Sequence, residues 1–390
     1  MLSRRTALLQ SGGFGIVAAM GLPGFRALAE TVPGTPRMIV HRGKPLNAEP
    51  RGALLRSSFI TAQDNFYIRN HGTIPRLSAD TYRLQLQGEG VAPMTLSLAD
   101  IRTRFPQRSI KAVLQCAGNR RADFTKVKSV SGDGWQAGAI SNAEWTGVGL
   151  GDVLKAAGVM PKAGKHVAFA SHDEIEEEGE HFNFGVSIPL EKALASETLL
   201  AFAMNGEPLS AEHGFPLRVV TPGYAGVRSP KWLASITVQD HPSDNHIQQK
   251  EYKLLPPEMT KETQDLSKGV TINEMPLNSA ILEPAEGARL ARGRNTLRGY
   301  AIATGLPIRR VEVSADGGIS WRDAKLENHP DAPWSWTFWS AEMDLRPGTT
   351  QLVARAYDDA GETQPVSAAE IYNFPGYLCR AWHRVDVQVA

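Results

Sequence analysis

The hydrophobic pattern of this chain changes once, across the polar, proline-bearing stretch KLLPPEMTKETQDLSKG at residues 253–269. Before it, short alternating runs such as TYRLQLQG (81–88) mix with helical patterns. After residue 275, short alternating runs follow one another without a helical period. A helix-and-strand pattern and an all-strand pattern belong to different architectures, so the 390 residues predict two domains.

The first part predicts an α+β domain over residues 30–255. In LSLADIRTRF, Ser97 is placed to cap a helix, and Asp100 follows three residues later. In GVGLGDVLKAAG (147–158), apolar residues recur along one helix face as far as Gly158, which stops the helix. Helices and strands do not alternate regularly, which argues against a doubly wound parallel sheet.

Residues 256–274 are expected to connect this domain to a β-sandwich of immunoglobulin-like type over residues 275–390. In RRVEVSADGGISWRDAKL (309–326), Val311 and Val313 share one strand face and a turn follows. The cysteine pair of antibody domains is missing from this part, which has Cys379 alone.

The first 29 residues predict an export signal. They contain twin arginines at Arg4 and Arg5, an apolar run over residues 12–22 and a small-residue step at residues 27–29. The apolar run is too short to span a bilayer. Because the twin-arginine route carries folded proteins, the signal predicts a soluble periplasmic protein and favours a cofactor inserted before export.

The overall charge argues against several classes of partner. The formal net charge is +1, and no basic surplus points to nucleic acid or to a membrane surface. Any site for an anion must therefore be a local cluster of cations.

One of the two cysteines, Cys116, stands in VLQCAGNRRADF (113–124). In an exported chain the default is a disulfide with Cys379, but the two lie in different predicted domains. A nucleophilic role needs a nearby base, and a zinc site needs several Cys or His at short spacing. A single thiolate can also bind a metal whose other ligands come from an organic cofactor. The residues alone leave these readings open.

LQCAGNRR resembles the cysteine segment of the sulfite oxidase family of molybdenum enzymes. Five further segments match blocks of that family in the same order, so the resemblance covers residues 55–390: FYIRNHG (66–72), GWQAGAIS (134–141), MNGEPLSAEHGFPLRVVTPGYAGVRSPKWL (204–233), KEYK (250–253) and AWHRV (381–385). It implies a molybdopterin domain, a β-sandwich that forms a homodimer, and oxidation of sulfite to sulfate.

The resemblance also implies a role for each matching residue. Cys116 is the implied thiolate ligand of molybdenum, a metal suited to soft sulfur donors. Arg69 and Arg121 are implied to hold the substrate oxygens, because a planar guanidinium suits oxyanions, with Trp135 in the pocket wall. Tyr252 is implied to lie near the metal. The implied contacts to molybdopterin are His71, His213, Arg218, Ser229 and Lys231.

One position departs from the family pattern. Vertebrate members carry a further pocket arginine where this chain has Pro375, and the nearby Arg380 is not at the same position. This puts the charge of the substrate pocket in doubt. Arg120, next to the implied substrate arginine, is expected to brace the loop.

The chain has no C-x-x-C-H haem motif. An external electron acceptor, such as a c-type cytochrome, is therefore expected. Two alternatives remain: a related molybdenum oxidoreductase acting on another sulfur or nitrogen oxyanion or a sulfoxide, and, more distantly, a secreted binding module with a structural disulfide.

Overall fold

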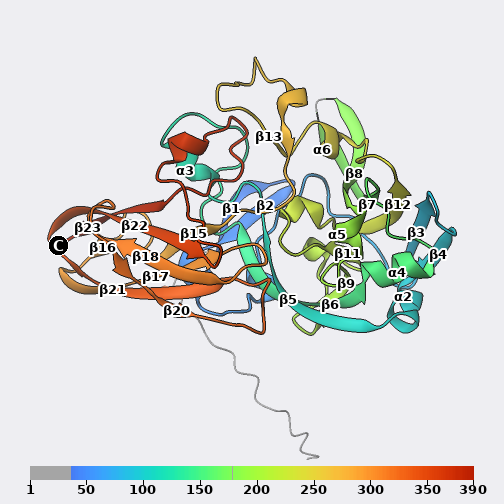
Figure 1. Cartoon of the computed structure of the whole chain (residues 1–390), viewed down its shortest axis with the longest axis horizontal. Helices are drawn as coiled ribbons and strands as arrows, with labels where there is room; N and C mark the ends of the chain where they lie inside the picture. Colours follow the sequence, from blue (N-terminus) through green and yellow to red (C-terminus); the bar gives the residue numbers. More distant parts are fainter. Residues whose placement is uncertain (1–36, 178) are drawn as a thin grey trace, which may run out of the picture.

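The computed structural model describes residues 37–177 and 179–390, so the predicted export signal at residues 1–29 lies outside the described part. Figure 1 shows two bodies side by side, with the strands of residues 278–389 on one side and the earlier sheets and most helices on the other. The expected α+β domain followed by a β-sandwich is confirmed.

The first domain contains two five-stranded sheets. One consists, in spatial order, of β10 (Glu207–Pro208), β9 (Leu199–Met204), β6 (Ile140–Gly149) and β5 (Gln107–Gln115), with β11 (Arg218–Val220) also paired to β9. The other consists of β4 (Met94–Ser97), β3 (Arg83–Gly88), β12 (Leu233–Gln239), β7 (His166–Glu177) and β8 (Glu180–Pro189). Strands β3 and β12 pair in parallel, while β5, β6, β7 and β8 form antiparallel pairs.

Six short α-helices and five 3-10 turns connect the described strands. The α-helices are α1 (Gly52–Arg56), α2 (Leu98–Arg104), α3 (Arg121–Thr125), α4 (Leu150–Ala156), α5 (Leu190–Leu194) and α6 (His246–Gln249). The 3-10 turns are Gln63–Asn65, Ala211–His213, Gly226–Arg228, Leu266–Lys268 and Ala368–Ile371. None of the helices in the described part is long and apolar enough to cross a membrane.

The predicted helix ends are confirmed. The Ser97 side chain accepts from the Asp100 backbone, and the Asp100 carboxylate accepts from the Ser97 backbone, forming a capping box at the start of α2. Gly158 follows α4 with φ +88°, a conformation that favours glycine.

Two small hairpins flank this domain. Strands β1 (Met38–Gly43) and β2 (Leu46–Pro50) pair near its start. Strands β13 (Lys253–Leu254) and β14 (Val270–Thr271) pair across the predicted connector.

The second domain is a sandwich of two sheets. One sheet consists, in order, of β15 (Asn278–Glu283), β17 (Gly293–Ile302), β21 (Thr337–Leu345) and β20 (Lys325–Glu327). The other consists of β16 (Arg289–Leu290), β23 (His383–Val389), β22 (Gly348–Asp358), β18 (Ile308–Ser314) and β19 (Arg322–Asp323). Val311 and Val313 are both fully buried between the sheets, as the alternation predicts.

The second domain anchors the loop that follows β5. The amide of Asn119 donates to the Tyr300 hydroxyl at 2.9 Å. Arg120, which is fully buried, donates to Asn278 Oδ1 at 2.8 Å and to Asp123 Oδ2 at 2.9 Å. These bonds agree with the bracing role expected for Arg120, and they fix the loop that carries the cysteine.

Candidate active site

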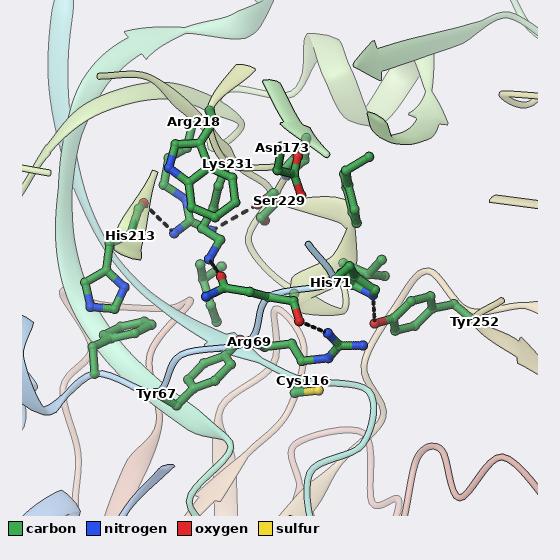
Figure 2. A pocket seen from close by; sticks show the side chains of 18 residues that line it. Tyr67, Arg69, His71, Cys116, Asp173, His213, Arg218, Ser229, Lys231 and Tyr252 are labelled. Atoms are coloured by element: carbon green, nitrogen blue, oxygen red, sulfur yellow. Dashed lines mark hydrogen bonds between the residues drawn. The ribbon is translucent and has the colours of Figure 1, made fainter. Parts of the chain in front are cut away.

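A cavity opens in the first domain. Its walls come from the segment after the first 3-10 turn, the end of β5, and the loops around β11 and β12. It brings together eight of the residues singled out from sequence: Arg69, His71, Cys116, His213, Arg218, Ser229, Lys231 and Tyr252. Figure 2 shows the thiol at one end of this group and Arg218 with Lys231 at the other.

Cys116 directly follows β5, and its loop holds the thiol in place. Its own N–H donates to the Ala139 carbonyl at 2.9 Å, and the Gly118 N–H donates to Sγ at 3.4 Å. Both Cys116 and Cys379 are free and buried, so the structural disulfide considered from sequence is not formed. A buried single thiol at a cavity wall suits the metal-ligand reading.

Arg69 lies between the thiol and a histidine–tyrosine pair (Figure 2). His71 Nε2 and the Tyr252 hydroxyl are 2.7 Å apart, within hydrogen-bonding distance. Burial alone would lower the pKa of Arg69, but the acidic groups around it together outweigh burial and raise that pKa above its ordinary value; they are Tyr252, Cys116, Glu251 and Tyr377. Burial, followed by the Arg69 charge, lowers the pKa of His71 well below its usual range. This end of the cavity therefore offers a permanent cation beside a neutral imidazole.

Basic groups line the other end of the cavity: His213 and Arg218 are buried, and Lys231 is half-buried. Arg218 donates to the carbonyls of His213 and Ser229, at 3.0 Å each. Lys231 Nζ donates to the Glu212 carbonyl at 2.8 Å and to Asn70 Oδ1. The Ser229 hydroxyl accepts from the Thr221 N–H at 3.0 Å. Nε2 of His213 lies 3.0 Å from the Gln63 carbonyl, so three basic side chains converge where backbone carbonyls hold them.

At this end of the cavity, burial and mutual repulsion disfavour the positive charges of the basic side chains when no anion is bound. Burial lowers the pKa of Arg218 to about 10, and burial together with Arg218 lowers that of Lys231 well below its usual range. Burial, then Lys231 and Arg218, lowers the pKa of His213 to about 3. An anion bound among these side chains would oppose each shift, because a nearby negative charge favours the protonated form. The donor set therefore fits a phosphate group.

Two glycines leave room for this arrangement. A Cβ on Gly226 would lie 2.7 Å from the Tyr67 hydroxyl. Gly214 has φ +104°, and a Cβ there would lie 3.0 Å from Lys231 Cβ. Both positions require glycine for the cavity wall to keep its shape.

Arg121 and Trp135 are not among the residues that line this cavity. Arg121 donates from Nη1 to the Asp133 carbonyl at 3.0 Å and from Nε to the Pro375 carbonyl at 3.1 Å. Trp135 is fully buried, in the same apolar cluster as Cys116. Both lie close to the cysteine loop. The implied contact of Arg121 with substrate and the implied place of Trp135 in the substrate pocket wall stay predictions.

Asp173 is a cavity residue that the sequence reasoning missed. It is buried, and its Oδ1 has no hydrogen-bond partner in the described part of the chain. The signal was in the alternation of β7, because Asp173 shares the buried face with Ser171 and Ile175. An acid on the apolar face of a strand marks a candidate site residue.

Because the Asp173 carboxyl is buried, we expect the free energy of unfolding to depend on pH. Burial raises its pKa from 3.8 to about 6, so between these values the folded chain holds this proton more tightly than the unfolded chain. The contribution of this proton to the free energy of unfolding is fully present below about pH 4, and it is lost as the pH rises through about 6. In cofactor-free protein, we expect Asp173→Asn to increase the free energy of unfolding by about 3 kcal/mol at pH 7 but little near pH 4. Urea denaturation at both pH values measures this, and an equal effect at both would contradict it.

Two family models match the chain. Residues 71–247 match the oxidoreductase molybdopterin binding domain, and residues 269–390 match the Mo-co oxidoreductase dimerisation domain. The fold, the cavity and these matches define a molybdopterin-dependent oxidoreductase.

Similar proteins include sulfite oxidases from animals and plants. The mitochondrial sulfite oxidase of Homo sapiens is 42% identical over 365 residues, which cover 91% of this chain and 66% of the human protein. The sulfite oxidase of Arabidopsis thaliana is 37% identical, covering 93% of this chain and 98% of that protein. The solved structure of the sulfane dehydrogenase SoxCD from Paracoccus pantotrophus is 26% identical with a TM-score of 0.74, covering 97% of this chain and 96% of that one. This chain belongs to the sulfite oxidase family, and it spans about two thirds of the human and several other animal relatives.

Proposed function

We propose that this chain oxidises sulfite to sulfate at a molybdenum centre held by Cys116. The observation that carries the proposal is a cavity with Arg69 beside the thiol at one end and basic side chains at the other. The first end suits a small oxyanion, and the second suits the phosphate of molybdopterin. The sulfite oxidases at 37% and 42% identity support the same substrate.

When bound, the molybdenum cofactor supplies the redox chemistry of the reaction. The chain contributes a sulfur ligand through Cys116, and His213, Arg218, Ser229, Lys231 and Asp173 are positioned to hold the pterin and its phosphate. Arg69 attracts and orients the anion. Burial raises the pKa of Tyr252 well above its usual range, so its hydroxyl keeps its proton and can donate a hydrogen bond.

We also propose that the electrons leave to a separate protein such as a c-type cytochrome. His71 lines both the cavity and an open groove on the surface. A carrier docked in the groove would contact a residue of the cavity wall. Reduction of added cytochrome c by sulfite measures this transfer, and sulfite turnover only with oxygen would contradict it.

Arg69→Gln is expected to raise the KM for sulfite by about ten- to a hundred-fold, because it removes a charge-assisted hydrogen bond. Glutamine keeps a polar side chain of moderate length but loses the charge. The exposed Arg76→Gln on the same segment is the control. Steady-state kinetics at equal molybdenum content measures the effect, and an unchanged KM would count against the anion role of Arg69.

We propose a homodimer formed through residues 275–390. The match to the dimerisation domain supports it, as do the exposed apolar side chains of Ile319 and Val366 on the sandwich. Sedimentation of the full chain at micromolar concentration tests it, and a monomer mass would refute it.

We propose export to the periplasm by the twin-arginine route. Support comes from the sequence of residues 1–29 alone. Mature protein from the periplasm should begin near Glu30. Active protein retained in the cytoplasm with an intact N-terminus would rule export out.

A further inference from the structure

A tyrosine from the second domain lies beside the candidate substrate residues. The Leu378 N–H donates to the carbonyl of Ala117, the residue after the candidate metal ligand, at 2.8 Å. Gly376 has φ +66° and Leu378 has φ +55°, so the backbone adopts left-handed conformations on both sides of Tyr377. The amide N–H of Tyr377 donates to Asn373 Oδ1 at 2.9 Å. The segment thus holds Tyr377 in one place next to the cysteine loop.

The Tyr377 ring contacts two of the residues singled out from sequence. It stacks on Tyr252 with ring centroids 5.2 Å apart and an interplanar angle of 20°. The guanidinium carbon of Arg121 lies 5.3 Å from the centre of the same ring. Tyr377 therefore joins Arg121, outside the large cavity, to Tyr252, which lines it.

The surroundings of the Tyr377 phenol are charged. Burial raises its pKa to about 12, and Glu251 adds to this, while Arg121 and Arg69 oppose it. Both arginines therefore lie within electrostatic reach of the phenol. The hydroxyl keeps its proton near neutral pH and remains a hydrogen-bond donor.

The Tyr377 hydroxyl has no hydrogen-bond partner among residues 37–177 and 179–390. The Tyr377 side chain is half-buried. Tyr252 and Tyr300 are buried, and their hydroxyls are paired, the first with His71 and the second with Ala137 and Asn119. A phenol donor within electrostatic reach of Arg121 and Arg69 is suited to an oxyanion.

We propose that Tyr377 is a further substrate-binding residue, whose hydroxyl donates a hydrogen bond to an oxygen of the anion held by Arg69 and Arg121. The inference rests on the proposed function. It also gives a role to the segment in which Pro375 replaces a family arginine, because a phenol adds a donor without adding a charge. The Pro375 carbonyl, meanwhile, accepts from Arg121.

Tyr377→Phe tests the proposal, because phenylalanine keeps the stacked ring and removes only the hydroxyl. With molybdenum-loaded protein, we expect the KM for sulfite and the dissociation constant of sulfate each to rise by about tenfold or more. We expect kcat to change by less than about threefold, since the interaction is made in the ground state as well. Tyr372→Phe is the matched control, because it removes a hydroxyl on the same segment that donates to the Ser129 carbonyl.

The outcomes separate this inference from the proposed function. Sulfate binding is measured by calorimetry and needs no turnover, so it decides the role of Tyr377 even where sulfite is not oxidised. A wild-type protein without sulfite turnover would defeat the proposed function alone. Normal sulfite turnover with the same KM and the same sulfate binding in Tyr377→Phe would overturn this inference alone. A fall in kcat with unchanged sulfate binding would overturn it as well.

Discussion

Cys116→Ser is expected to abolish the reduction of added cytochrome c by sulfite. A hydroxyl is a poor substitute for a thiolate at a metal that prefers soft sulfur ligands. Loss of a residue that only supports a metal ligand costs about 10- to 100-fold, so loss of the ligand itself should lower turnover by more than about 100-fold. The substitution is nearly isosteric, and the loop is held by bonds that do not involve the thiol, such as Asn119 to Tyr300. The measurement is initial rate at saturating sulfite, with thermal unfolding as a check on folding.

Cys379→Ser is the matched control. This thiol is also free and buried, in a separate cluster with Phe124 and Tyr372. It should keep activity near that of the wild type. Full activity in the Cys116 variant, or equal losses in both variants, would defeat the ligand assignment.

Lys231→Met is expected to impair retention of the cofactor. The side chain is half-buried at the end of the cavity that fits a phosphate, where it reaches Asn70 and the Glu212 carbonyl. Removing one charged donor from a phosphate should weaken cofactor binding by about ten- to a hundred-fold. Molybdenum and pterin per chain after gel filtration measure the loss.

Lys192→Met is the control for this variant. Lys192 is also half-buried, but it pairs with Glu197 at 2.6 Å and does not line the cavity. It should retain a full complement of molybdenum. Equal retention in both variants would show that Lys231 does not hold the phosphate.

Local sequence patterns predicted individual helices and strands well, but they did not predict how distant segments contact one another. The capping pair Ser97 and Asp100, the stop at Gly158 and the alternation at Val311 are all settled within a few residues. The β1–β2 hairpin was missed because its pairing depends on the rest of the fold. Glu49 there is fully buried and accepts hydrogen bonds from the backbone of the distant loop at residues 136–138.

The candidate site was predictable only in part for the same reason. Cys116 and Tyr252 belong to segments that spacing alone cannot bring together, and the resemblance supplied that link. It could not supply Tyr377, which reaches the site through a turn of the second domain. Asp173 was visible in the alternation of its strand, but a single acid carries no chemistry until the cations around it are placed.

The most direct test is sulfite turnover as a function of molybdenum content, with nitrate and methionine sulfoxide assayed in parallel. The account predicts that cytochrome c reduction by sulfite rises in proportion to molybdenum, up to about one atom per chain because there is one metal-binding thiol. Protein expressed with tungstate in place of molybdate should be inactive. Sulfite turnover by molybdenum-free protein, or loaded protein that acts on nitrate or the sulfoxide but not on sulfite, would contradict it.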